Sequence, residues 1–225
     1  MGTAAGVDVC HPLGILPVKN FRDGVLENVE ELMSDKMEKL FVKDALCHRC
    51  HIQCGRILKV ESGPYAGEVK GPEYEAMFSL GGTLCITNLE MVLAANGLCD
   101  EYGVDAISAG ATLAFAMECY ENGILTKEDL GGLDLTWGNH EAAYKLLEMT
   151  LKREGIGDIL AEGSRVAAEK IGKGSRKYAM HIKGLELAGY EPRSLKASGL
   201  NLSTIALGAN HTTGQSPQEF APPGT

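Results

Sequence analysis

Three cysteines crowd into eight residues of this 225-residue chain, in the pattern Cys47-x2-Cys50-x3-Cys54. The spacing lets three thiolates converge on one small object. An iron–sulfur cluster often takes three such local ligands and a fourth from elsewhere in the protein. Zinc is the alternative, because His48 and His51 are interleaved and a Cys/His tetrahedron can be drawn. The spacing favours the cluster, since structural zinc sites usually combine two separated ligand pairs; three buried thiols are the third interpretation.

The other four cysteines lie among apolar or small residues and are expected to be thiols of the core. The total of seven is odd, and the N-terminus lacks the basic-then-apolar pattern of a signal peptide. A disulfide scaffold is therefore not expected, and we predict a cytoplasmic protein. One of these four could be the fourth cluster ligand, but nothing in the sequence selects it: Cys10, Cys85, Cys99 and Cys119.

Composition narrows the class of protein further. Hydrophobic residues make up 44% and charged residues 23%, which is ordinary for a globular chain with a real core. The net charge of −9 repels phosphate backbones, so we expect no nucleic-acid partner. No run of about 18 apolar residues appears, so we expect no membrane span.

Hydrophobic periodicity predicts a mainly α fold with few or no short strands. Gly-Pro pairs make residues 57–74 rich in turns, with a hairpin as one possibility. We expect three parts: a loop or extended segment over 1–23, a helical domain over 24–172 that holds the three-cysteine cluster and the Asp100–Asp105 motif, and over 173–225 the loop-rich start of a following helical domain. The helical patterns cover residues 24–46, 88–98, 106–122, 139–155 and 157–171.

Two acidic motifs follow the cysteines. In the first, Gly71-Pro-Glu73-Tyr-Glu75, a rigid turn precedes two carboxylates. It is either a solvated turn or a carboxylate placed for proton transfer beside a redox centre. The second runs from Asp100 to Asp105 between two predicted helices. It is either an interhelical turn or a set of acceptors for a polar ligand.

The C-terminal quarter carries Tyr190-Glu191-Pro-Arg193 and Gly-Ala-Asn-His211. A histidine in a glycine-rich loop is more often hydrogen-bonded or solvated than catalytic.

Taken in order, these strings resemble the tungsten-dependent aldehyde:ferredoxin oxidoreductase family over about residues 14–212. Agreement of many strings in one order is more specific than any single motif. The further strings that carry the resemblance are Leu16-Pro-Val-Lys-Asn20-Phe, Asn96-x2-Cys99-Asp100-x2-Gly103-Val104-Asp105, Ala116-Met-Glu118-x-Tyr120, Arg153-Glu-Gly-Ile-Gly-Asp158, Leu160-Ala-Glu-Gly163 and Lys183-Gly-Leu-Glu186.

The resemblance implies two cofactors. By carry-over, Cys47, Cys50 and Cys54 are ligands of a [4Fe–4S] cluster, whose fourth cysteine lies further along the family's chain. The cluster would pass electrons between a tungsten (or molybdenum) bis-pterin centre and ferredoxin, the implied partner.

The first of the family's two pterin-binding motifs matches Asp100, Gly103 and Asp105, with Val104 in place of leucine. The second would lie beyond this chain.

The resemblance also implies an active site for a small aldehyde. Glu75 aligns with the family's active-site glutamate, His211 with an active-site histidine, and Tyr190 with a tyrosine that lines the substrate pocket. Oxidising an aldehyde to an acid releases two electrons and protons, which suits a carboxylate or imidazole near the metal.

Departures from the family limit this expectation. The family's protein is much longer and begins with a β-rich pterin-cradling domain, so this chain resembles its middle portion. We therefore expect the chain alone to be inactive without its missing parts or a partner subunit. Glu191 also replaces the usual aspartate. The alternatives are a stand-alone iron–sulfur electron-transfer module and a helical structural domain with a zinc knuckle.

Overall fold

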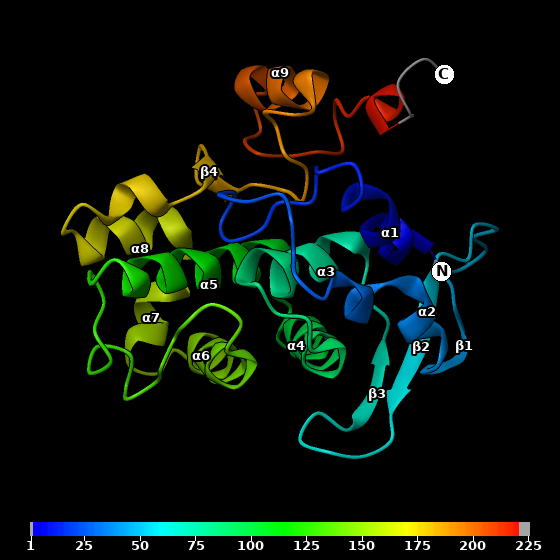
Figure 1. Cartoon of the computed structure of the whole chain (residues 1–225), viewed down its shortest axis with the longest axis horizontal. Coiled ribbons are helices and arrows are strands. Elements are labelled where there is room, and N and C mark those ends of the chain that lie inside the picture. The colour runs from blue at the N-terminus through cyan, green and yellow to red at the C-terminus, as the bar shows by residue number, and fades with distance from the viewer. Residues whose placement is uncertain (1, 221–225) are drawn as a thin grey trace.

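A long helix of small residues, α5 (Ala106–Glu121), runs through the middle of the computed structural model, which describes residues 2–220 (Figure 1). Every residue of α5 from 109 to 119 is buried. Helix α3 (Tyr74–Leu80) packs along it. Gly110 permits this contact, because a Cβ there would overlap the Ser79 carbonyl group. The helix predicted over 106–122 is confirmed.

Side-chain caps start α5 itself and two of the helices that pack against it. Asn88 accepts from the Met91 amide at 2.9 Å and starts α4 (Leu89–Tyr102). Asp105 accepts from the Ile107 amide at 3.1 Å and starts α5. Asn139 accepts from the Ala142 amide at 3.1 Å and starts α6 (His140–Lys152). Each cap satisfies an amide that the helix itself leaves unpaired. These helices were predicted correctly.

The helical pattern over 157–171 is divided in the structure. It forms α7 (Ile156–Leu160) and α8 (Gly163–Ile171). Gly163, the first residue of α8, has a positive φ of 82°. That left-handed conformation suits glycine and turns the chain between the two helices.

The single helix expected over 24–46 is wrong. The chain there forms a 3-10 turn (Val29–Leu32), a short helix α2 (Ser34–Glu38) and strand β1 (Phe41–Ala45). Met33 is extended at ψ 164° and separates the first two. The apolar residues at helical spacing therefore point inward from separate short turns, and Val25, 70% exposed, lies outside the core.

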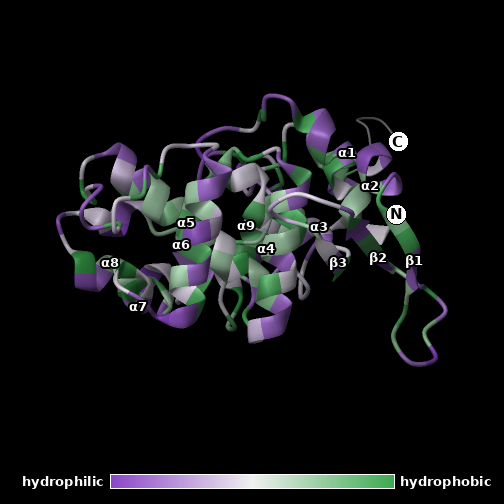
Figure 2. Cartoon of the chain, turned by 90° about the horizontal axis from the view of Figure 1, so that it is seen from below, coloured by the Kyte–Doolittle hydropathy of each residue, from purple (hydrophilic) through white to green (hydrophobic). Residues whose placement is uncertain are grey.

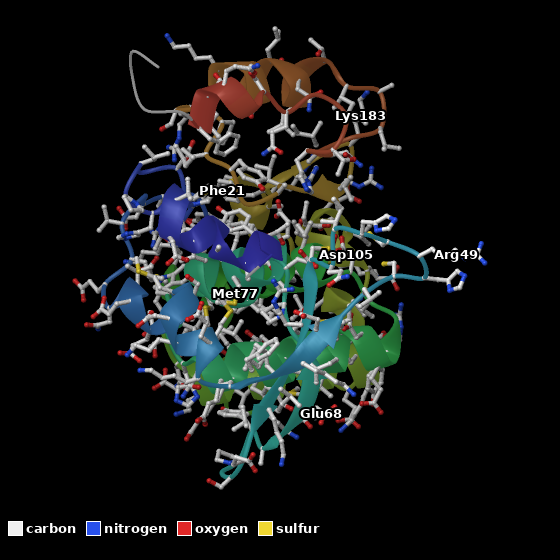
Figure 3. The ribbon with its side chains drawn as sticks, turned by 90° about the vertical axis from the view of Figure 1, so that its right-hand side faces the viewer. Phe21, Arg49, Glu68, Met77, Asp105 and Lys183 are labelled. Atoms are coloured by element: carbon white, nitrogen blue, oxygen red, sulfur yellow. The ribbon has the colours of Figure 1, made fainter. Side chains whose placement is uncertain are left out.

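The hairpin considered for residues 57–74 is confirmed. Strand β2 (Gly55–Val60) pairs antiparallel with β1 and with β3 (Gly67–Lys70), in the order β1-β2-β3. The cysteine-rich segment 46–54 is the loop between β1 and β2. Figure 3 shows Arg49, in this loop, projecting away from the body of the molecule.

The outer parts of the chain contain more regular structure than expected. The range 1–23 includes α1 (Gly6–Cys10). The range 173–220 includes a two-stranded sheet, β4 (His181–Ile182) with β5 (Leu185–Glu186), and helix α9 (Lys196–Thr204). The last five residues of the loop-rich range 173–225, residues 221–225, lie outside the described residues.

One apolar core includes residues from all three predicted ranges, from Ala4 to Leu195. The division at 23 and 172 stays a prediction. Helices account for 46% of the described residues and strands for 10%, so the mainly α class holds while the expectation of few or no strands needs correction.

Among residues 2–220, no helix has the length and apolar character that crossing a bilayer requires. In Figure 2 the helices carry hydrophilic and hydrophobic residues side by side, as expected where one face packs on a core.

Candidate active site

A cavity of about 420 Å³ opens at the N-terminal end of α3. Its walls come from that end of α3, the end of β3, the N-terminal segment at Thr3, the second half of α4, the start of α5, and two segments near the C-terminus. The structure thereby brings together five residues that the sequence placed in the site. They are Glu75, Asp100, Asp105, Tyr190 and His211.

The first residues of α3 hold the C-terminal segment in place. The Tyr74 hydroxyl donates to the Gly189 carbonyl oxygen, and the Gly189 amide donates to Glu75 Oε2 at 2.8 Å. A side chain at Gly189 would meet the Phe78 ring within 2.7 Å. The absence of a Cβ therefore lets this segment approach α3 closely enough to form one wall of the cavity.

Glu75 is a buried carboxyl with one oxygen left unbonded. Burial raises its pKa to about 7, while the Gly189 amide acts in the opposite direction. Oε1 accepts no hydrogen bond from the described residues and lies 3.5 Å from His211 Nε2. Burial also lowers the pKa of His211. Near pH 7 the pair thus comprises a half-protonated carboxyl and a neutral imidazole, which can exchange a proton.

Tyr190 stands among aromatic rings beside this pair. Its ring centroid lies 5.2 Å from Tyr74, 5.7 Å from His211 and 5.5 Å from Phe220. Burial is the main cause of its raised pKa. The phenol therefore stays neutral and forms an apolar wall with a polar tip.

The Asp100–Asp105 segment has both a structural and a site role. Asp100 lies in the last turn of α4 rather than between the helices, and only residues 103–105 connect α4 with α5. Gly103 ends α4 with φ 66°, and the Val104 amide donates to the Cys99 carbonyl oxygen at 2.9 Å. Asp100 and Asp105 line the cavity, whereas Gly103 and Val104 do not. Figure 3 labels Asp105 at the start of α5. Its two oxygens accept from Ile107 and Ser108, so the helix itself fixes this carboxylate.

The cysteine loop stands apart from the cavity lining. Cys47 is exposed, and Cys50 and Cys54 are partly exposed. Within residues 2–220, no three Cys, His, Asp or Glu side chains are arranged to hold a metal ion. The loop thus offers three accessible thiols, the donor type that an iron–sulfur cluster requires, without the converged geometry.

The other cysteines behave as core thiols. Cys10, Cys99 and Cys119 are buried, as expected, and Cys85 is partly buried. Burial raises the pKa of Cys85 to about 11 and of Cys99 and Cys119 to about 12. These three thiols are therefore protonated at neutral pH in the metal-free protein.

The sequence reasoning missed two residues that line the cavity. The Thr3 hydroxyl accepts from the Tyr74 amide at 3.1 Å and donates to the Glu73 carboxylate, and no local motif marked it. Asn96 donates to the Lys70 carbonyl oxygen at 3.2 Å. Asn96 stands four positions before Asp100 in a helix, so helical periodicity offered a signal that both share one face.

The site thus combines a largely buried carboxyl, a half-buried imidazole and two aspartates, a set of groups that can hold and move protons. The chain belongs to the aldehyde ferredoxin oxidoreductase family. The family's model, "Aldehyde ferredoxin oxidoreductase, domains 2 & 3", matches residues 1–224. This confirms the resemblance on which the site residues were chosen.

The chain is similar to curated proteins that are much longer. It is 42% identical to the tungsten-containing aldehyde ferredoxin oxidoreductase of Pyrococcus furiosus over 212 residues, which cover 93% of this chain and 34% of that protein. It is 35% identical to the aliphatic sulfonate oxidoreductase, WOR-like subunit, of the same organism. That alignment covers 96% of this chain and 38% of that protein. The chain thus spans about a third of the length of these relatives.

A solved structure has a similar fold. The active-site complex BamBC of benzoyl-coenzyme A reductase, in complex with 1,5-dienoyl-CoA, aligns with a TM-score of 0.67 and 29% identity. The alignment covers 82% of this chain and 28% of that chain.

Proposed function

We propose that this chain is part of a tungsten (or molybdenum) pterin oxidoreductase that converts aldehydes to carboxylic acids. The cavity carries the proposal, because it gathers the proton-exchanging pair Glu75 and His211, the aromatic wall at Tyr190, and the carboxylates Asp100 and Asp105. The family and the tungsten-containing relatives support it.

The residues fit the two implied cofactors in their donor chemistry. Asp100 and Asp105 would hold a pterin through its N–H groups, and Cys47, Cys50 and Cys54 would hold three corners of a [4Fe–4S] cluster. The pterin-bound metal supplies a two-electron redox step, and the cluster supplies one-electron transfer to a ferredoxin. The chain itself holds these groups in place and moves protons.

The reaction balances as aldehyde plus water giving acid, two electrons and two protons. Glu75 has its pKa near 7, so its unbonded Oε1 can take up a proton and release it at neutral pH. His211 is neutral there and receives that proton through Nε2, 3.5 Å away. Tyr190 and the buried end of α3 keep bulk water from one side of this pair.

The charges of the cavity favour an uncharged substrate. Four carboxyl side chains line it: Glu73, Glu75, Asp100 and Asp105. Lys70 is the single lysine or arginine among the described residues of the lining. An anionic substrate would face net repulsion in this low-dielectric site, so a neutral aldehyde suits it better than a sulfonate.

The test uses the longer polypeptide that contains this chain, produced anaerobically with tungstate or molybdate. We expect iron with tungsten or molybdenum, and aldehyde-dependent reduction of a viologen dye. Glu75→Gln should lower kcat about 100-fold or more, since it removes a proton-transferring group. Glu68→Gln, an exposed change on β3 that Figure 3 labels, should leave the rate unchanged.

Metal analysis separates the alternatives in the same preparation. Iron and labile sulfide without tungsten or molybdenum would overturn the proposal in favour of an electron-transfer module. About one zinc in a colourless protein would favour a zinc-knuckle domain. An unchanged rate in Glu75→Gln would remove Glu75 from the proton path.

A further inference from the structure

A second, much smaller cavity lies behind Tyr190 and His211. Its volume is about 10 Å³, and both residues also line the large cavity. These two side chains therefore form the partition between the two spaces. The rest of the lining comes from the segment after β5, from α9 and from the loop that follows it: Ala188, Ser198, Asn201, Leu202 and Gln215.

Ser198 brings an unpaired hydroxyl into this small cavity. The residue is only 6% exposed, and its Oγ has no hydrogen-bond partner among the described residues. On the exposed face of the same helix, by contrast, Ser203 Oγ donates to the Leu200 carbonyl oxygen at 2.8 Å. A buried hydroxyl seldom stays unpaired in a folded protein, so this one points to a bound polar group.

The size and chemistry of the space fit a single water molecule. A volume of about 10 Å³ is close to the minimum that holds one water, which also needs two to four polar partners. The lining offers Ser198, Asn201, Gln215 and the His211 imidazole. A side chain of the substrate would not fit in so small a space.

We propose that one ordered water binds here between Ser198 Oγ and the His211 imidazole, and that it carries protons away from the active site. Its role as a proton carrier rests on the proposed function; the water site itself does not. His211 Nε2 faces Glu75 Oε1 at 3.5 Å, which leaves the other ring nitrogen, Nδ1, to bond the water.

The proton path follows from this geometry. Oxidation of each aldehyde releases two protons, while the electrons leave to the redox acceptor. Glu75 Oε1 passes a proton to His211 Nε2, and the imidazolium then releases a proton from Nδ1 to the water. The water then releases the proton to solvent. The imidazole is neutral again with its proton on Nε2, and a return to the Nδ1–H tautomer precedes the next transfer. Ser198 is a positioning residue in this path, because it holds the water rather than touching the substrate.

The charged groups around His211 suit this role. Glu75 faces it from α3, Asp105 raises its pKa from the start of α5, and the uncharged Tyr190 ring packs against it. Burial outweighs the carboxylate and lowers the pKa. The neutral ring can therefore accept a proton at pH 7 and needs a nearby acceptor to release it.

The test compares Ser198→Ala with Ser203→Ala in the 225-residue chain. A high-resolution crystal structure should show a water within hydrogen-bond distance of Ser198 Oγ and a His211 ring nitrogen. NMR titration should show the His211 pKa about 0.5 lower in Ser198→Ala, a roughly threefold change in the protonation constant. The imidazolium would lose its acceptor in this variant. Ser203→Ala should leave that pKa unchanged, and His211→Gln assigns the signal.

Either of two results overturns the inference: a cavity without water, or an unchanged His211 pKa in Ser198→Ala. Both measurements are independent of cofactor loading and aldehyde oxidation. Failure of the water site together with active, tungsten-loaded parent enzyme would therefore refute only the proton path. A water site in a parent protein that lacks aldehyde oxidation would refute only the proposed function.

Discussion

At the scale of single residues, Glu75 shows how burial prepares a side chain for proton transfer. Its carboxyl group receives one amide hydrogen bond, from Gly189, and its other oxygen is unbonded. One hydrogen bond is too little to offset the loss of hydration, so the protonated form is favoured in the folded state. The carboxyl group thus gains a pKa that suits proton exchange, and the folded protein loses stability when the group ionises.

Glu75 therefore makes stability depend on pH. Its folded-state pKa is about 7, against an ordinary value of 4.5. Between pH 4.5 and 7 the folded state keeps the Glu75 proton that the unfolded state has already released. The stabilising contribution is therefore fully present below pH 4.5 and is lost as the pH rises through about 7. Its size is about 3 kcal/mol at most. Urea unfolding at pH 5 and pH 8 should show this loss in the wild type and little of it in Glu75→Gln.

Glu68→Gln is the control, because this substitution removes the same kind of carboxyl group from an exposed position. Glu68→Gln should change the free energy of unfolding by the same small amount at both pH values, so it should keep the wild-type loss between pH 5 and pH 8. A Glu75→Gln variant that loses as much stability between pH 5 and pH 8 as the wild type would show that Glu75 titrates normally.

Residues of the site were predictable where they belong to local motifs. Glu75 follows a Gly-Pro turn, and Asp105 precedes a helix that it caps. Ser198 and Thr3 carry no such pattern. Their roles depend on contacts with residues far along the chain, such as the link from Thr3 to Tyr74, which only the folded molecule brings together.

At the scale of elements, the contact between α3 and α5 places the active site. Gly110 allows the backbone of α5 to approach Ser79 of α3, and the start of α3 then presents Glu75 beside the N-cap of α5. Any side chain at Gly110 pushes directly on a backbone carbonyl group, which cannot move aside as a flexible side chain can.

Gly110→Ala should therefore destabilise the chain by about 2 kcal/mol, although alanine is the better helix former by about 1 kcal/mol. Gly97→Ala in α4 is the matched control, because its Cβ would meet only the Val69 methyl group at 2.9 Å. Thermal and urea unfolding should rank Gly110→Ala well below Gly97→Ala. Equal stabilities would show that α3 and α5 can separate without cost.

Elements were predictable where caps and periodicity agree, as at Asn88 and Asn139. The pattern over 24–46 failed for a physical reason. Apolar residues three and four apart also arise when short turns face one core in succession, and only pairing with β2 shows that residues 41–45 are a strand. Strand pairing is a long-range interaction that local periodicity does not encode.

At the scale of the whole molecule, the core and the cysteine loop are separate structures. One apolar core joins residues from Ala4 to Leu195, while Cys47 is exposed in a loop between two strands. The core accounts for folding by burial of apolar surface. The loop thiols contribute little to that burial, so a bound cluster would serve electron transfer rather than hold the fold together.

Because the loop and the core are separate, replacing cysteine by serine should affect stability differently in the loop and in the core. Replacing Cys47, Cys50 and Cys54 together by serine should leave the urea midpoint of the 225-residue chain nearly unchanged and abolish iron binding on anaerobic reconstitution. Cys119→Ser places a hydroxyl in the buried face of α5 and should cost about 1–3 kcal/mol. If instead the loop variant unfolds while Cys119→Ser does not, a metal at the loop holds the structure. The zinc-knuckle interpretation would then replace the electron-transfer role.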